Sequence, residues 1–179
     1  MQERMHGSLP GIDTLDFLFS LDYSKLLKKR SVPMIAKSDM PNINDKPPAG
    51  SKPEGGAYRV LVVDDSMFIA KQLGQIFTSE GFEVAGTASD GAQGVEKYKE
   101  LHPNIDLVTM DITMPVMDGV SALEKILEFD KEACVIMVSA LGKEDVVKKS
   151  LLLGAKSYIV KPLDRKKVLE RVITVLKQR

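Results

Sequence analysis

The sequence predicts an α/β domain in which a doubly wound, five-stranded parallel sheet carries helices on both faces. Short runs rich in Val and Ile alternate five times with longer stretches of helical period beyond residue 57. Such alternation is typical of a parallel sheet wrapped by helices. The short runs are also apolar over most of their length, as strands that are covered on both faces require.

The expected elements follow one another along the chain. We expect strands at 59–63, 82–88, 105–110, 134–139 and 157–160. We expect helices at 66–80, 91–101, 119–128, 144–153 and 163–176. Ser66 and Asp118 are suitable N-caps, because their side chains can accept bonds from the free N–H groups of a first helical turn. Gly81 and Gly154 stand just after helical stretches, where a glycine often ends the helix.

The composition indicates one globular domain with an appendage: 179 residues, 44% hydrophobic and 28% charged. Lys plus Arg and Asp plus Glu number 25 each, so no overall charge draws the chain to nucleic acid or to an anionic membrane. The single Cys134 lies in an apolar run, which predicts a buried thiol and excludes an internal disulfide. Charged residues interrupt the apolar stretch at 12–27, so we expect neither a signal peptide nor a membrane span. We therefore expect a cytoplasmic location.

The chain before the predicted domain differs in composition. Residues 31–57 hold five of the nine prolines and three glycines, which predicts a flexible linker. Residues 1–30 form an N-terminal extension, in which residues 12–30 could fold as an amphipathic helix. Such a helix could contact its own domain or a second copy, it could be disordered, or the true start could be Met34 or Met40.

Charged and hydroxyl side chains follow four of the five expected strands. Asp64 and Asp65 follow the first strand, Asp111 follows the third, Ser139 ends the fourth and Lys161 follows the fifth. Ligands of open parallel sheets bind at this carboxyl edge. Three carboxylates gathered there would repel one another unless a cation neutralises them, and Mg²⁺ prefers oxygen ligands. The sequence therefore predicts a Mg²⁺ site.

The same side chains predict phosphoryl transfer. An aspartate can act as the nucleophile and form an acyl phosphate, and the protein then needs positive charge and donors around the phosphoryl oxygens. We therefore assign Asp111 as the nucleophile. Lys161 is expected to pair with the phosphoryl group, and the Ser139 hydroxyl to donate a hydrogen bond to it.

The domain at 58–179 resembles the CheY-like receiver (response regulatory) domains of two-component signalling. The stretches that carry the resemblance are 60–66, 106–119, 138–140 and 158–162. The resemblance implies the strand order 2-1-3-4-5 and phosphorylation of Asp111 by a histidine kinase. It also implies that the backbone carbonyl of Thr113 is a Mg²⁺ ligand and that a cis peptide bond precedes Pro162.

The resemblance further implies a switch. When Ser139 moves to the phosphoryl group, the Tyr158 ring is expected to turn inward. This would remodel the face formed by the helix at 144–153, the strand at 157–160 and the last helix. We expect this face to control a protein partner in chemotaxis or motility, such as a flagellar motor switch component, because no further domain follows residue 179.

Other functions compete with this interpretation. The protein could be a phosphorelay intermediate, or it could act through a separate transcriptional partner. An aspartyl-phosphate hydrolase of the haloacid-dehalogenase kind is disfavoured, because Thr113 stands where that family needs a second Asp. A flavodoxin-like carrier is disfavoured because Asp64 and Asp65 stand where a flavin phosphate needs donors. We expect a phosphoacceptor that assists its own phosphorylation and dephosphorylation, not an enzyme.

Overall fold

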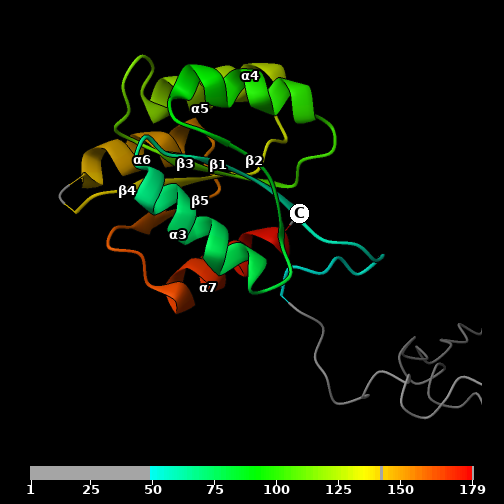
Figure 1. The fold of residues 1–179 in the computed structure, drawn as a ribbon. Coiled ribbons are helices and arrows are strands. Elements are labelled where there is room, and N and C mark those ends of the chain that lie inside the picture. The colour runs from blue at the N-terminus through cyan, green and yellow to red at the C-terminus, as the bar shows by residue number, and fades with distance from the viewer. Residues whose placement is uncertain (1–48, 142, 179) are drawn as a thin grey trace, which may run out of the picture. The chain divides into compact units, whose positions relative to one another are not determined.

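The computed structural model describes residues 49–141 and 143–178, which belong to a compact unit spanning residues 46–179 (Figure 1). The predicted extension at 1–30 and the predicted linker up to residue 48 lie outside the described residues. The predictions made for them, including the contacts of residues 12–30, stay predictions.

The sheet is parallel, has five strands and has the predicted order β2-β1-β3-β4-β5. Its strands are β1 (Arg59–Val63), β2 (Glu83–Ala88), β3 (Leu107–Asp111), β4 (Val135–Ser139) and β5 (Ser157–Val160). Three strands begin later than predicted: β2 begins at Glu83, β3 at Leu107, although Ile105 is also buried, and β4 at Val135. Asp111 is the last residue of β3 instead of the first residue after it.

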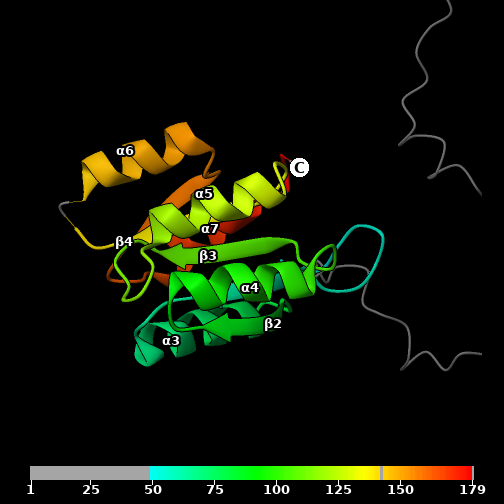
Figure 2. The same cartoon turned by 90° about the horizontal axis from the view of Figure 1, so that it is seen from above.

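Helices cover both faces of the sheet, as predicted (Figures 1 and 2). The helices are α3 (Met67–Thr78), α4 (Gly91–Leu101), α5 (Gly119–Phe129), α6 (Glu144–Leu153) and α7 (Arg165–Leu176). Helices α3 and α7 lie on one face, and α4, α5 and α6 lie on the other. Ser66 caps α3 as predicted, since its side chain accepts a bond from the Ile69 N–H at 3.4 Å.

The two predicted helix stops differ in their outcome. Gly154 is the C-cap of α6, with φ 123°, a conformation that favours glycine. Helix α3 ends at Thr78 with Ser79 as its C-cap, so Gly81 lies two residues beyond the cap. Helix α7 begins at Arg165 instead of residue 163, because Asp164 accepts a bond from the Lys167 N–H and acts as the N-cap.

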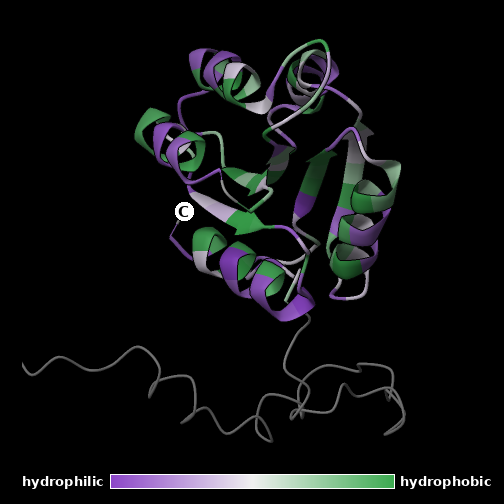
Figure 3. Cartoon of the chain, turned by 90° about the vertical axis from the view of Figure 1, so that its left-hand side faces the viewer, coloured by the Kyte–Doolittle hydropathy of each residue, from purple (hydrophilic) through white to green (hydrophobic). Residues whose placement is uncertain are grey.

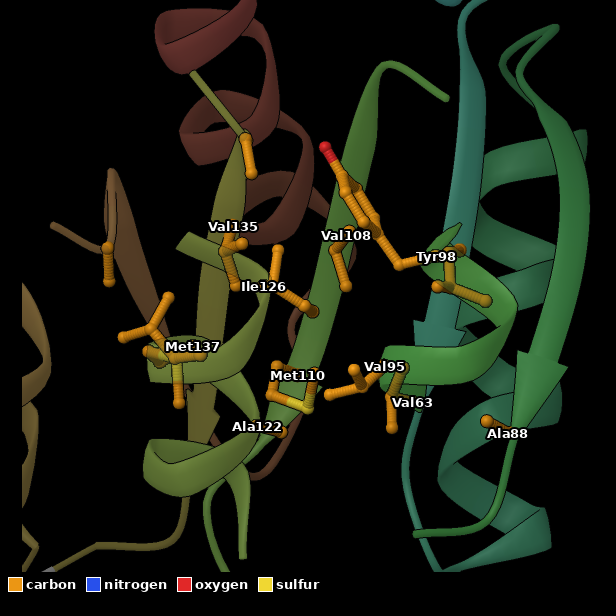
Figure 4. Packing of buried hydrophobic residues seen from close by; sticks show 14 of the residues in the cluster. Val63, Ala88, Val95, Tyr98, Val108, Met110, Ala122, Ile126, Val135 and Met137 are labelled. Carbon is orange, nitrogen blue, oxygen red and sulfur yellow. The ribbon is translucent and has the colours of Figure 1, made fainter. Parts of the chain in front are cut away.

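Two hydrophobic clusters form the core, one on each face of the sheet. One cluster packs strand residues against α4, α5 and α6, and Figure 4 shows Met110 beside Val95 and Val63 within it. The other packs the opposite face against α3 and α7, and it includes Cys134, which is buried as predicted. In Figure 3 the inner strands carry mainly the green of apolar residues. Thr109 is an exception to this apolar pattern, since it is a polar residue that is fully buried in the middle strand, β3.

Residues 49–57 correct the predicted linker boundary. Ser51 and Ala57 pair as an antiparallel bridge, and the Gly50 N–H donates to the Glu80 carbonyl at 2.8 Å. The Lys52 ammonium lies 2.9 Å from an Asp106 carboxylate oxygen. Gly50 also lies so close to the residues just before β2 that an added Cβ would sit 2.2 Å from the Phe82 nitrogen. This part of the predicted linker therefore packs on the domain, since tertiary contacts compensate the low apolar content.

Within the described residues, no helix combines the length and the apolar character that crossing a membrane requires.

Candidate functional site

Three carboxylates meet at the carboxyl edge of the sheet. One oxygen from each of Asp64, Asp65 and Asp111 lies within 4.8 Å of the other two. The sheet places them there because β1 and β3 are neighbours in register, with Val63 beside Met110, so the residues that follow lie level. Asp64 and Asp111 are 2% and 5% exposed, whereas Asp65 is exposed. The predicted acidic cluster therefore forms a recess whose floor is mostly buried.

Lys161 brings a positive charge into this recess. Its Nζ lies 2.9 Å from Asp111 Oδ1 and 2.9 Å from Asp64 Oδ2. The backbone holds the residue in place, because the Lys161 N–H donates to the Ser139 carbonyl at 2.7 Å. The peptide bond between Lys161 and Pro162 is cis, as the resemblance implied.

Burial and charge shift the pKa values of the paired groups. Burial raises the pKa of Asp111 above that of an ordinary aspartate, and the neighbouring Asp64 and Asp65 raise it further, against the opposing effect of Lys161. Burial alone would lower the pKa of Lys161, but its contacts with Asp111 and Asp64 outweigh burial and raise it. Lys161 therefore keeps its charge, whereas the pKa of Asp111 lies above that of an ordinary aspartate.

The donor set fits a hard divalent cation. Asp64 Oδ1 accepts a hydrogen bond from the Ser66 N–H at 2.9 Å. Asp64 Oδ2 is buried, and the Lys161 ammonium lies 2.9 Å from it as an ion-pair partner. Three carboxylates also face a single ammonium group, so the recess keeps an excess of negative charge. Oxygen ligands with uncompensated charge are the environment that Mg²⁺ prefers.

Ser139 and Tyr158, the predicted switch pair, line one cavity of about 240 Å³ between β4, α6 and β5. The Ser139 side chain is buried, and its hydroxyl donates to the Ala140 carbonyl at 2.9 Å. The Tyr158 ring is half-buried, with the Arg171 guanidinium carbon 5.7 Å from the ring centre. The Ser139 hydroxyl is therefore engaged with the backbone next to it, and space adjoins both side chains.

The predicted output face carries a larger groove. A groove of about 910 Å³ runs between β5 and α7 and is lined by residues that include Tyr158, Lys167 and Arg171. Leu141 and Val160 also line it, and these two side chains are 77% and 40% exposed. The groove combines apolar and basic side chains with the acidic Asp164 and Glu170.

The loop between β3 and α5 contains features that the sequence did not reveal. Val116 has φ 63°, in the left-handed region that disfavours a β-branched residue. Gly119 approaches β3 so closely that a Cβ would lie 1.9 Å from the Asp111 carbonyl oxygen. Gly91 holds the loop from outside, with its N–H donating to the Met117 carbonyl at 3.0 Å. Thr113 lies exposed in this loop, and its predicted role as a ligand stays a prediction.

The same loop ends in the predicted cap. Asp118 accepts hydrogen bonds from the N–H groups of Val120 and Ser121, each at 2.9 Å. The bond from Ser121 is the main reason why the pKa of Asp118 is lowered. The predicted N-cap role of Asp118 is therefore confirmed.

Comparisons with known proteins agree with this geometry. The model of the family described as the response regulator receiver domain matches residues 60–173. The chain is similar to a chemotaxis protein CheY from Treponema pallidum, 73% identical over 144 residues, which are 80% of this chain and 100% of the relative. It is also similar to a chemotaxis protein CheY from Bacillus subtilis, 49% identical over 116 residues, which are 65% of this chain and 95% of the relative.

A solved structure is similar as well. It is a chain in the crystal structure of the CheX-CheY-BeF3-Mg+2 complex from Borrelia burgdorferi. The TM-score is 0.71 at 60% sequence identity, and the match covers 73% of this chain and 98% of that chain.

Proposed function

The chain belongs to the response regulator receiver domain family, and on that premise we propose that Asp111 accepts a phosphoryl group from a histidine kinase in a Mg²⁺-dependent reaction. The observation that carries this proposal is the meeting of three carboxylates within 4.8 Å, with the Lys161 ammonium 2.9 Å from Asp111. A receiver of this kind is a signalling protein and not a catalyst of an external reaction.

Each residue of the recess has a distinct role in the proposed transfer. Asp64, Asp65, Asp111 and the Thr113 carbonyl would hold Mg²⁺, which when bound neutralises charge on the carboxylates and the phosphoryl oxygens. An Asp111 oxygen attacks phosphorus, the bond from phosphorus to the donor nitrogen breaks, and the donor imidazole keeps that electron pair and takes a proton. Lys161 stays charged and pairs with a phosphoryl oxygen.

The proposed output follows from the Ser139 hydroxyl. In the present structure it donates to a neighbouring carbonyl, and a phosphoryl group on Asp111 would offer it a charged acceptor. Its movement would leave room for the Tyr158 ring to turn into the cavity of about 240 Å³ that both side chains line, and this would change the groove between β5 and α7. We propose that this face controls a protein partner in chemotaxis, such as a flagellar motor switch component.

The similarity to chemotaxis proteins CheY supports that output over the alternatives. A phosphorelay role, a separate transcriptional partner, assistance to its own dephosphorylation and a cytoplasmic location stay predictions. The Borrelia burgdorferi neighbour was solved with CheX, so we propose that a CheX-type protein also binds this chain.

The proposal is tested by intact mass spectrometry after incubation with Mg²⁺ and acetyl phosphate. We expect a phosphate adduct on the wild-type chain that is stable in acid and labile in base. Asp111→Asn should lack the adduct, and Asp145→Asn, which changes an exposed carboxylate on α6, should retain it. An adduct that persists in Asp111→Asn, or that forms equally well in excess EDTA, would contradict the proposed chemistry.

A further inference from the structure

Two backbone hydrogen bonds fix the loop between β3 and α5. At its base, the Gly119 N–H donates to the Ile112 carbonyl at 3.0 Å. Near its other end, the Met117 carbonyl accepts the Gly91 N–H at 3.0 Å, and Gly91 belongs to a different helix, α4. Thr113, whose carbonyl is the proposed Mg²⁺ ligand, lies between these two points. The backbone that carries this carbonyl is therefore held partly by α4.

The Gly91 N–H is available to the loop because of its place in α4. The first N–H groups of an α-helix have no acceptor within the helix. Gly91 is the first residue of α4, and Asp90 before it is the N-cap, whose carboxylate accepts the Gln93 N–H at 2.9 Å. The partial positive charge at a helix N-terminus also favours a carbonyl oxygen there. The start of α4 is therefore suited to hold the Met117 carbonyl.

Position 91 has no room for a side chain. An added Cβ would lie 2.5 Å from the Met117 carbonyl oxygen, 3.0 Å from the Ala122 Cβ and 3.1 Å from the Asp118 carbonyl oxygen. Two of these three atoms belong to the backbone of the loop, which cannot turn away as a flexible side chain can. A residue larger than glycine would therefore push the loop away from α4.

Gly94, one turn further along α4, brings the same helix face close to the sheet. A Cβ at Gly94 would lie 2.9 Å from Val63 Cγ1 and 3.6 Å from Met110 Cε. Val63 and Met110 directly precede two carboxylates of the recess, and Figure 4 shows their side chains close together in the core. Helix α4 therefore contacts both the strands that carry these carboxylates and the loop that carries the Thr113 carbonyl.

We propose that Gly91 is a positioning residue for Mg²⁺ binding. Its N–H and its lack of a side chain place the loop so that the Thr113 carbonyl joins the three carboxylates of the metal site. This inference rests on the proposed function. Outer contacts orient the groups that bind a metal, and their loss costs about 10–100-fold in metal affinity. Gly91 acts through the loop alone and takes no part in the phosphoryl transfer.

The test measures Mg²⁺ affinity on the full chain without a phosphodonor. An NMR titration of the isotope-labelled protein with magnesium chloride gives the dissociation constant. We expect Gly91→Ala to weaken Mg²⁺ binding about tenfold or more.

Val172→Ala is the control, because this valine is fully buried on the opposite face of the sheet. It should lower the melting temperature, since it removes buried methyl groups. Its dissociation constant for Mg²⁺ should stay within about twofold of wild type, because the substitution is distant from the loop. Wild-type Mg²⁺ affinity in Gly91→Ala, or an equal loss of affinity in Val172→Ala, would overturn the inference.

A second measurement on the wild-type chain covers the case in which Gly91→Ala does not fold. Coupling between two sites is reciprocal, so Mg²⁺ must stabilise the Gly91 bond if that bond supports Mg²⁺ binding. Saturating Mg²⁺ should slow hydrogen exchange at the Gly91 amide about tenfold more than at the Gly50 amide. The Gly50 amide bonds to Glu80 at the other end of the strands.

Equal slowing of the two amides would overturn the inference. A wild-type chain that accepts no phosphate from acetyl phosphate in the presence of Mg²⁺ would instead overturn the proposed function.

Discussion

Replacing Thr109 by valine should stabilise the protein. The Thr109 side chain is fully buried in β3, and its Oγ1 has no hydrogen-bond partner among the described residues. A buried hydroxyl that has lost its water and gained no partner costs about 1–3 kcal/mol. Valine has the same shape, and the position lies between Val62 and Ile136 on the neighbouring strands. We therefore expect Thr109→Val to raise the free energy of unfolding by about 1–2 kcal/mol.

Urea unfolding in the presence of EDTA measures this change. The midpoint should rise while the slope of the free energy against urea stays constant, because the surface exposed on unfolding is unchanged. Thr109→Ser is the control, since it keeps the hydroxyl but removes a buried methyl group, and it should lose about 1 kcal/mol. A Thr109→Val protein that is less stable than wild type would refute the reasoning, and would indicate a buried water bonded to the hydroxyl.

Three further predictions concern the recess and the loop beside it. Lys161→Met leaves Asp64 and Asp111 without their counter-charge and should lower the free energy of unfolding in EDTA by about 2 kcal/mol. This loss is smaller than for a fully buried pair, because the lysine side chain is 20% exposed. Urea unfolding measures the change, and an unchanged free energy of unfolding would contradict the pairing. Because the folded-state pKa of Asp111 is raised, its contribution to stability is present below the pKa of an ordinary aspartate and is lost as the pH rises through the raised pKa. Unfolding measured without metal at several pH values should show this fall in the free energy of unfolding. Asp111→Asn should make the free energy of unfolding less dependent on pH. Gly119→Ala places a Cβ 1.9 Å from the Asp111 carbonyl oxygen and should lower the melting temperature strongly. Gly74→Ala in α3 is the control, because a Cβ there meets nothing within 4 Å, and its melting temperature should match or exceed that of wild type. Equal melting temperatures of the two variants would refute the close approach.

The strands and helices were predictable because hydrophobic periodicity is a local signal. The buried runs around Val60–Val63 and Val135–Ser139 can be seen without knowledge of their neighbours. The acidic recess was predictable for a related reason, since parallel strands end at one edge and thereby bring Asp64 and Asp111 together. What the sequence could not provide was the state of each side chain, such as the bond from Ser139 to the Ala140 carbonyl.

The errors came from contacts between distant residues. Composition alone predicted a linker up to residue 57, yet Lys52 pairs with Asp106 and Gly50 bonds to Glu80. The left-handed conformation of Val116 was equally hidden, because the residue type argues against it. Two backbone bonds hold the loop at this point, from the Met117 N–H to the Pro115 carbonyl and from the Gly91 N–H of α4 to the Met117 carbonyl.

The segment at 49–57 also determines where a label or surface anchor can be attached without affecting the site. Its contacts with Glu80 and Asp106 lie just before β2 and β3, at the opposite end of the strands from Asp111. A mechanical load applied at residue 49 would first strain these contacts at the amino ends of the strands. A dye or surface anchor attached there would therefore leave the carboxyl edge accessible and mechanically undisturbed.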